Sequence, residues 1–83
     1  MKEVKMEPEV MKLLAVGMIG SLGLLGPALA IGLIGYSALT GLARNPEASG
    51  PIMTNMILVT AFAEAIGIYA LIIAIILAMG LGA

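Results

Sequence analysis

The hydrophobic pattern divides the chain into a polar start and two long apolar segments. Residues 1–12 are polar, residues 13–43 carry no charge, and residues 51–83 carry a single charge. Residues 44–50, Arg-Asn-Pro-Glu-Ala-Ser-Gly, separate the two segments and are rich in turn formers. Each apolar segment exceeds the ~20 residues that a helix needs to cross a bilayer, and neither alternates apolar and polar residues as a barrel strand does. The pattern predicts an all-α membrane protein consisting of one two-transmembrane-helix hairpin over residues 1–83.

Prolines mark the expected starts of both helices. Pro8 suits the first turn of the inner helix, and Pro51 suits the start of the outer helix, because an N–H missing from a first turn leaves no bond unmade. Pro27 lies inside the first helix and frees the carbonyl of Gly23, which predicts a bend there. A hairpin with two spans places both termini on the same side of the membrane.

Glu64 is the one charged residue of the second apolar segment. It lies ~20 Å along the helix axis from Pro51, near the middle of the hydrocarbon layer. Placing a charged side chain at that depth costs about 2.5–3.5 kcal/mol of insertion free energy, so such a residue rarely occurs without a function. The usual tasks are proton relay, ion binding and pairing with a cation on another helix; a protonated Glu that only joins helices is the structural alternative.

Small residues recur through the first apolar segment on two flanks. At about 100° per residue, one flank carries Gly23, Gly26, Ala30 and Gly41, and the roughly opposite flank carries Gly17, Ser21, Ala28, Gly32 and Gly35. Small residues let membrane helices approach closely. Two opposite flanks therefore predict a row of identical chains that closes into a homo-oligomeric ring, with residues 13–43 inside and residues 51–83 outside.

Composition excludes several classes of protein. The chain is 61% hydrophobic and has no Cys, His or Trp, which excludes a soluble domain and the usual zinc and thiolate chemistry. No nucleophile has a base partner, so neither enzymatic activity nor a metal or other cofactor is expected. The net charge of −1 gives no support to nucleic-acid binding or to a polybasic lipid patch.

A secretory signal is an alternative interpretation of residues 13–30, which end in the cleavage-like sequence Ala28-Leu29-Ala30. Against it, the preceding region mixes three acids with three lysines, and the sequence after the supposed cleavage is also apolar enough for a membrane. An uncleaved first helix is the preferred interpretation.

Three motifs in order resemble the c subunit, or proteolipid, of rotary ATP synthases. The stretch Gly26-Pro27-Ala28-Leu29-Ala30-Ile31-Gly32 is similar to the family's alternating small residues, with Gly26, Ala28, Ala30 and Gly32 as packing positions. The turn Ala43-Arg44-Asn45-Pro46 is similar to the family's polar loop. Ala63-Glu64-Ala65, followed by Gly67-Ile68-Tyr69, resembles the ion-carrying carboxylate of the second helix.

The resemblance implies a ring of identical c subunits, surrounded by membrane lipid, that rotates against a stator a subunit with an arginine. Glu64 would be alternately protonated and deprotonated, and Arg44, Asn45 and Pro46 would contact the central-stalk subunits. The family's topology puts this loop on the cytoplasmic side, with the bacterial plasma membrane as the expected location. A literal count of lysines in the tail would instead put the termini in the cytoplasm; the short mixed-sign tail is the weaker guide.

The neighbours of Glu64 favour a proton over sodium as the carried ion. A sodium site needs several oxygen ligands, and sodium-type members of the family supply them from the first helix and just after the carboxylate. Here those positions hold Ile31, Ala65 and Ile66. Tyr69 and Thr60 remain as polar neighbours, and Phe62 and Ile31 are expected to support the proton site.

Other interpretations remain open on the sequence alone. They are a sodium-translocating version, the proteolipid of a vacuolar or archaeal-type rotary ATPase, a small proton-coupled exporter and a structural hairpin adaptor. The Arg-Asn-Pro loop argues for the synthase class, and two Tyr with one Phe are few for a substrate site of an exporter. An adaptor would not require Glu64.

Overall fold

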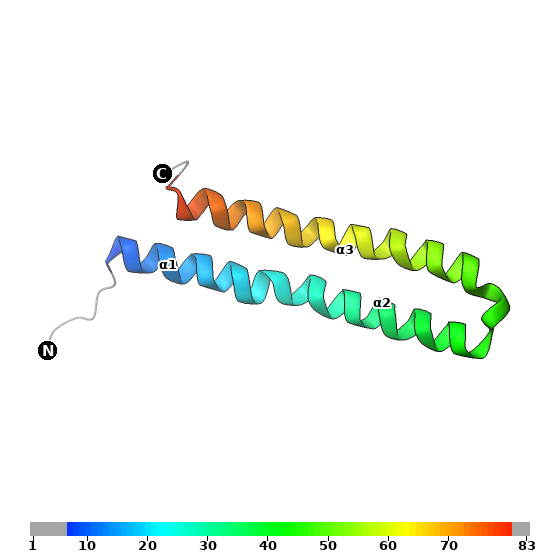
Figure 1. Cartoon of the computed structure of the whole chain (residues 1–83). Coiled ribbons are helices and arrows are strands. Elements are labelled where there is room, and N and C mark those ends of the chain that lie inside the picture. The colour runs from blue at the N-terminus through cyan, green and yellow to red at the C-terminus, as the bar shows by residue number, and fades with distance from the viewer. Residues whose placement is uncertain (1–6, 81–83) are drawn as a thin grey trace, which may run out of the picture.

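A computed structural model describes residues 7–80, which form a long helical hairpin (Figure 1). The first arm runs through α1 (Pro8–Met18), the π-helical turn η1 (Ile19–Gly23) and α2 (Leu24–Arg44). After the 3₁₀ turn η2 (Pro46–Ala48), the chain returns through α3 (Ser49–Ala78). The two arms lie side by side, with the start of α1 and the end of α3 at the same end of the hairpin. The predicted all-α hairpin is confirmed.

The first helix begins earlier than the polar-to-apolar boundary at residue 13 predicts. Pro8 occupies its first turn, as expected, and the N–H of Met11 donates to the Glu7 carbonyl at 2.9 Å. Glu9 and Lys12, predicted to lie in the polar tail, are helical and form an ion pair at 3.3 Å. Backbone geometry and an i,i+3 pair set this boundary, since hydrophobicity is not required for a helix to start. The rest of the predicted tail, residues 1–6, lies outside the described residues.

A π-helical turn interrupts the first arm and ends four residues before Pro27. Ile19–Gly23 adopt i→i+5 geometry, and the hydroxyl of Ser21 donates to the Gly17 carbonyl at 2.8 Å. Pro27 follows inside α2, where it has no N–H to offer the Gly23 carbonyl. A π turn, a serine bonded to the preceding turn and a proline are each known causes of a bend in a helix. The structure thus places a π turn on the N-terminal side of Pro27, and the bend predicted from Pro27 stays a prediction.

The connection between the arms is tighter than the predicted loop of residues 44–50. Arg44 is the last residue of α2, and Asn45 leaves helical geometry with φ −142° and ψ 76°. Its N–H still donates to the Gly41 carbonyl at 2.9 Å, and Ala48 donates to Asn45 at 3.0 Å. α3 then begins at Ser49, so Pro51 is the third residue of the helix rather than the first. Pro51 is tolerated there because the first four N–H groups of a helix have no intrahelical partner.

The second arm ends at a glycine before the end of the chain. α3 stops at Ala78, and Gly80 adopts φ +72°, in the left-handed region that glycine occupies readily. The outer helix, predicted to run to residue 83, is therefore shorter, and residues 81–83 lie outside the described residues.

The hairpin is flat and has almost no core of its own. Its Cα atoms extend 67 × 30 × 8 Å, and among the described residues only Ala63 and Ala74 are buried. Both arms are long and apolar enough to cross a membrane, over Pro8–Arg44 and Pro46–Ala78. With an apolar surface all round, such a hairpin needs lipid or further protein around it.

Close approaches between the arms set their register. A Cβ built on Gly23 would lie 3.5 Å from the Ala70 Cβ, and one built on Gly41 would lie 3.6 Å from the Ile52 Cδ1. Gly23 and Gly41 were both predicted to lie on a flank that faces a neighbouring chain. They lie instead at the interface within the hairpin, because the returning helix takes that side of the first arm.

Candidate ion-binding site

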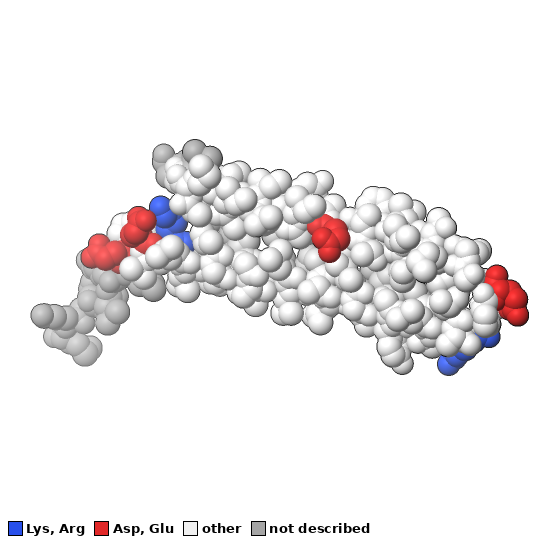
Figure 2. Space-filling model, viewed as in Figure 1, with Lys and Arg blue, Asp and Glu red and all other residues white. Residues whose placement is uncertain are grey.

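Glu64 lies midway along α3, between two apolar stretches of the hairpin. Figure 2 shows the charged side chains at the two ends of the molecule and a single acidic side chain between them. Its neighbour Ala63 is one of the two buried residues and faces the first arm, whereas Glu64 itself is exposed in the single hairpin. One residue advances the helix by about 100°. The carboxylate therefore points sideways, onto one flank of the hairpin, rather than between its two arms.

An open groove on this flank receives the carboxylate. The groove has a volume of about 510 Å³ and is lined by residues of both arms: Leu24, Pro27, Ala28, Ile31, Glu64, Gly67, Ile68 and Leu71. The Gly67 position brings α3 close to α2, because a Cβ there would lie only 3.7 Å from Leu24 and 3.8 Å from Pro27. The groove is thus a shallow apolar surface with one ionisable group.

The lining offers very few ligands for a metal ion. Apart from Glu64, every side chain of the groove is aliphatic or a glycine, and none has a side-chain oxygen. Within the described residues 7–80, no cluster of three or more His, Cys, Asp or Glu could hold a metal. The groove can bind a proton on one carboxylate, and a larger cation would need oxygen ligands from outside this hairpin.

The structure brings only some of the predicted site residues together. Ile31 lines the groove with Glu64, as does Ala28, which was predicted to be a packing position. Thr60, Phe62 and Tyr69 do not line it, and the last two are 66% and 65% exposed in the single hairpin. Tyr69 follows Glu64 by five residues, which is about 140° around the helix. Its side chain leaves the helix on a different side from the carboxylate.

Sequence reasoning gave five groove residues no role in the site, although it named Gly67 and Ile68 in the motif that follows Glu64: Leu24, Pro27, Gly67, Ile68 and Leu71. Their positions follow from the hairpin register. Facing residues such as Gly67 and Pro27, or Gly41 and Ile52, are nearly equidistant in sequence from the turn at Pro46. Counting outward from that turn would have placed the Pro27–Ile31 segment opposite Glu64.

The remaining predicted positions lie on the surface. A Cβ on Gly26 or Gly32 would meet no atom of this hairpin within 4 Å, and Ala30 is half-buried. Arg44, Asn45 and Pro46 are exposed at the turn, at the end of the hairpin away from the termini (Figure 1).

Comparison with known proteins agrees with this architecture. The family model for the C subunit of ATP synthase matches residues 14–77, which include both arms, the turn and Glu64. This chain belongs to the ATP synthase c-subunit family. The family prediction made from the three motifs is confirmed, and a two-helix membrane hairpin is the fold of that family.

Individual relatives match over most of the chain. The ATP synthase c subunit of Dehalococcoides mccartyi is 54% identical over 72 residues, which is 87% of this chain and 95% of the relative. Those of Petrotoga mobilis and Thermotoga petrophila are 42% and 44% identical, over 80% and 76% of this chain and 69% and 74% of the relatives. The relatives are bacterial, and the chain is an integral membrane protein of this family.

Proposed function

We propose that this chain is the proton-carrying subunit of the rotor ring of an ATP synthase, with Glu64 as the carrier. The observation that supports this proposal is the composition of the groove, in which the Glu64 carboxylate is the only side chain with an oxygen. A proton needs one acceptor and apolar surroundings, whereas sodium needs several oxygen ligands. The sodium-translocating alternative lacks those ligands within the hairpin.

Two environments would let the same carboxyl take up and release a proton. In contact with lipid, the neutral form is favoured because an apolar medium solvates a charge poorly. Next to a fixed cation, the carboxylate is favoured. Among the described residues, Arg44 is the one arginine, and it lies at the end of α2 at the turn. The cation near Glu64 must therefore come from another subunit, for which an arginine of the stator a subunit is the candidate.

The open glycines support a ring of copies of the same chain. A Cβ built on Gly26 or Gly32 would meet no atom of the hairpin within 4 Å outside the adjoining turns, although both glycines lie inside a membrane-spanning arm. Close approach of another helix is the usual use of such positions in membranes. We place α1 and α2 on the inside of the ring and α3 on the outside.

The turn is proposed as the contact with the central stalk. Arg44, Asn45 and Pro46 are exposed and held by backbone hydrogen bonds at one end of the hairpin. We place this end on the cytoplasmic side of a bacterial plasma membrane. The role of the chain in the synthase is ion transport, and catalysis belongs to other subunits.

Proton pumping by the assembled synthase in inverted membrane vesicles tests the proposal. Glu64→Gln keeps the shape of the side chain but cannot release a proton, so ATP-driven acidification of the vesicles should be lost. Glu64→Asp retains a carboxyl and serves as the matched control, with pumping reduced rather than abolished. Pumping by the Gln variant would refute the role of Glu64, and pumping that requires added sodium would refute the proton assignment.

A further inference from the structure

A second groove lies on the flank of the hairpin opposite Glu64, nearer the turn. It has a volume of about 540 Å³ between the two arms, and its lining includes Ser37 of α2 with Pro51, Asn55, Met56 and Val59 of α3. Asn55 precedes Glu64 by nine residues, which is about half a turn away around the helix. The two grooves therefore lie on opposite sides of the plane that contains both arms.

Polar groups in this second groove indicate that protein rather than lipid covers it. One N–H of the Asn55 carboxamide donates to the Pro51 carbonyl at 2.8 Å. No hydrogen bond within the described hairpin takes the other N–H or the Oδ1. Ser37, which carries a hydroxyl, lines the same groove. Both residues lie within the membrane-spanning arms, where polar side chains usually face other helices or water rather than lipid.

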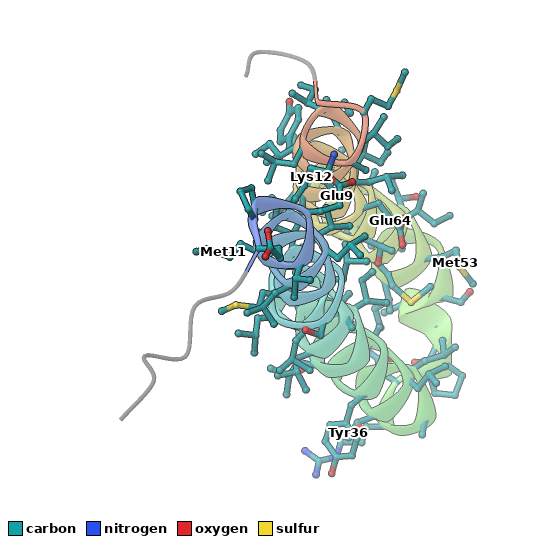
Figure 3. All side chains as sticks on the ribbon, turned by 90° about the vertical axis from the view of Figure 1, so that its left-hand side faces the viewer. Glu9, Met11, Lys12, Tyr36, Met53 and Glu64 are labelled. Atoms are coloured by element: carbon teal, nitrogen blue, oxygen red, sulfur yellow. The ribbon has the colours of Figure 1, made fainter. Side chains whose placement is uncertain are left out.

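The other flank of the same chain carries exposed apolar side chains at the same position along the hairpin as the second groove. Met53 and Ile57 precede Glu64 by eleven and seven residues, which returns each to within about 20° of the carboxylate direction. They are 47% and 59% exposed. Figure 3 looks along the hairpin from the termini and shows Met53 and Glu64 on the same side. These two residues lie between Pro51 and Val59 in sequence, so they stand at the level of the second groove.

We infer that the side chains of Met53 and Ile57 from the next copy of this chain pack into the second groove. The inference rests on the proposed ring and adds to it the surfaces that meet near the turn. A groove on one flank and side chains on the other form a head-to-tail contact, which repeats around a ring. The thioether of Met53 is flexible and fills irregular apolar space. The contact also removes the Asn55 carboxamide from lipid.

Cysteine cross-linking tests this contact in the full chain, which has no native cysteine. The double variant Met53→Cys/Asn55→Cys puts one thiol on each flank. Mild oxidation of the purified assembly should give a ladder of covalent oligomers on a denaturing gel. The pair Ile57→Cys/Val59→Cys tests the same contact if the Asn55 substitution prevents folding.

Two controls separate this contact from other arrangements. Each single cysteine variant should remain monomeric under oxidation, whereas a face-to-face contact would give dimers from a single cysteine. In Met53→Cys/Thr54→Cys, the second thiol lies on the side of α3 directed away from α2, and no ladder is expected. Native mass measured before oxidation reports the ring independently.

The outcomes distinguish this inference from the proposed function. A ladder from either opposite-flank pair, without one from the Thr54 control, supports the contact. An intact ring with no ladder from either pair overturns the contact and leaves the rotor-ring proposal standing. Absence of a ring from the unsubstituted chain overturns both.

Discussion

Gly67 of α3 lies against Pro27 of α2, such that a Cβ added to the glycine would stand 3.8 Å from the proline Cβ. This contact is three residues from Glu64 and forms the floor of its groove. The glycine removes bulk from α3 at the point where α2 carries a proline ring. The position of the carboxylate relative to the first arm therefore depends on how closely this pair packs.

Substitutions at Gly67 should separate small from large side chains. Gly67→Ala places its methyl group in ordinary van der Waals contact, with 3.7 Å to Leu24, and helix propensity favours Ala by about 0.5–1 kcal/mol. Gly67→Leu must displace Pro27 or Leu24, for which overpacking typically costs about 1–3 kcal/mol. Thermal dissociation of the detergent-solubilised assembly measures the difference. Equal stability of the Ala and Leu variants would contradict the close contact.

Gly32 should be sensitive for a different reason. It has open space in the hairpin, so Gly32→Leu should leave helix content by circular dichroism unchanged. In a ring, the same leucine would block the approach of the neighbouring helix, and native mass should shift from a large assembly to small species. Gly32→Ala is the matched control and should assemble. A normal, stable ring from the Leu variant would count against ring packing at this position.

Sodium should not protect Glu64 from a carbodiimide. The reagent attacks a protonated carboxyl, and the groove has no other side-chain oxygen to help bind sodium. At a fixed pH, the rate of labelling should be the same with and without millimolar sodium. Mass spectrometry of the labelled chain gives the rate, with Glu64→Gln as the unreactive control. Protection by sodium would require ligands from a neighbouring subunit.

Tyr69 is predicted to act on the Glu64 of a neighbouring copy. Within one chain the tyrosine leaves α3 about 140° from the carboxylate and does not line its groove, so any hydrogen bond between them must cross a subunit boundary. Tyr69→Phe should leave the ring mass unchanged and move the pH dependence of carbodiimide labelling. Phe62→Leu, which removes no hydroxyl, is the control. An unchanged pH profile in Tyr69→Phe would leave Thr60 or a backbone carbonyl as the partner.

The sequence alone determined the membrane class, the hairpin and the one candidate carrier. These follow from local properties: apolar segments long enough to span a bilayer, a turn rich in Pro, Asn and Gly, and a lone carboxylate at Glu64. Each of them requires only counting along the chain. The family resemblance followed from the same short motifs and was confirmed by the match over residues 14–77.

Only the tertiary structure decided which residues surround Glu64 and which glycines face the second arm. A uniform advance of about 100° per residue cannot include the π turn at Ile19–Gly23, which has more residues per turn and shifts the phase of everything before it. A projection of the first helix around its own axis also does not predict which side of it packs against α3. Gly23 and Gly41 therefore pack within the hairpin, while Gly32 remains open. The physical reason is that composition fixes which residues are small or apolar, but the register of two antiparallel helices fixes what each residue meets.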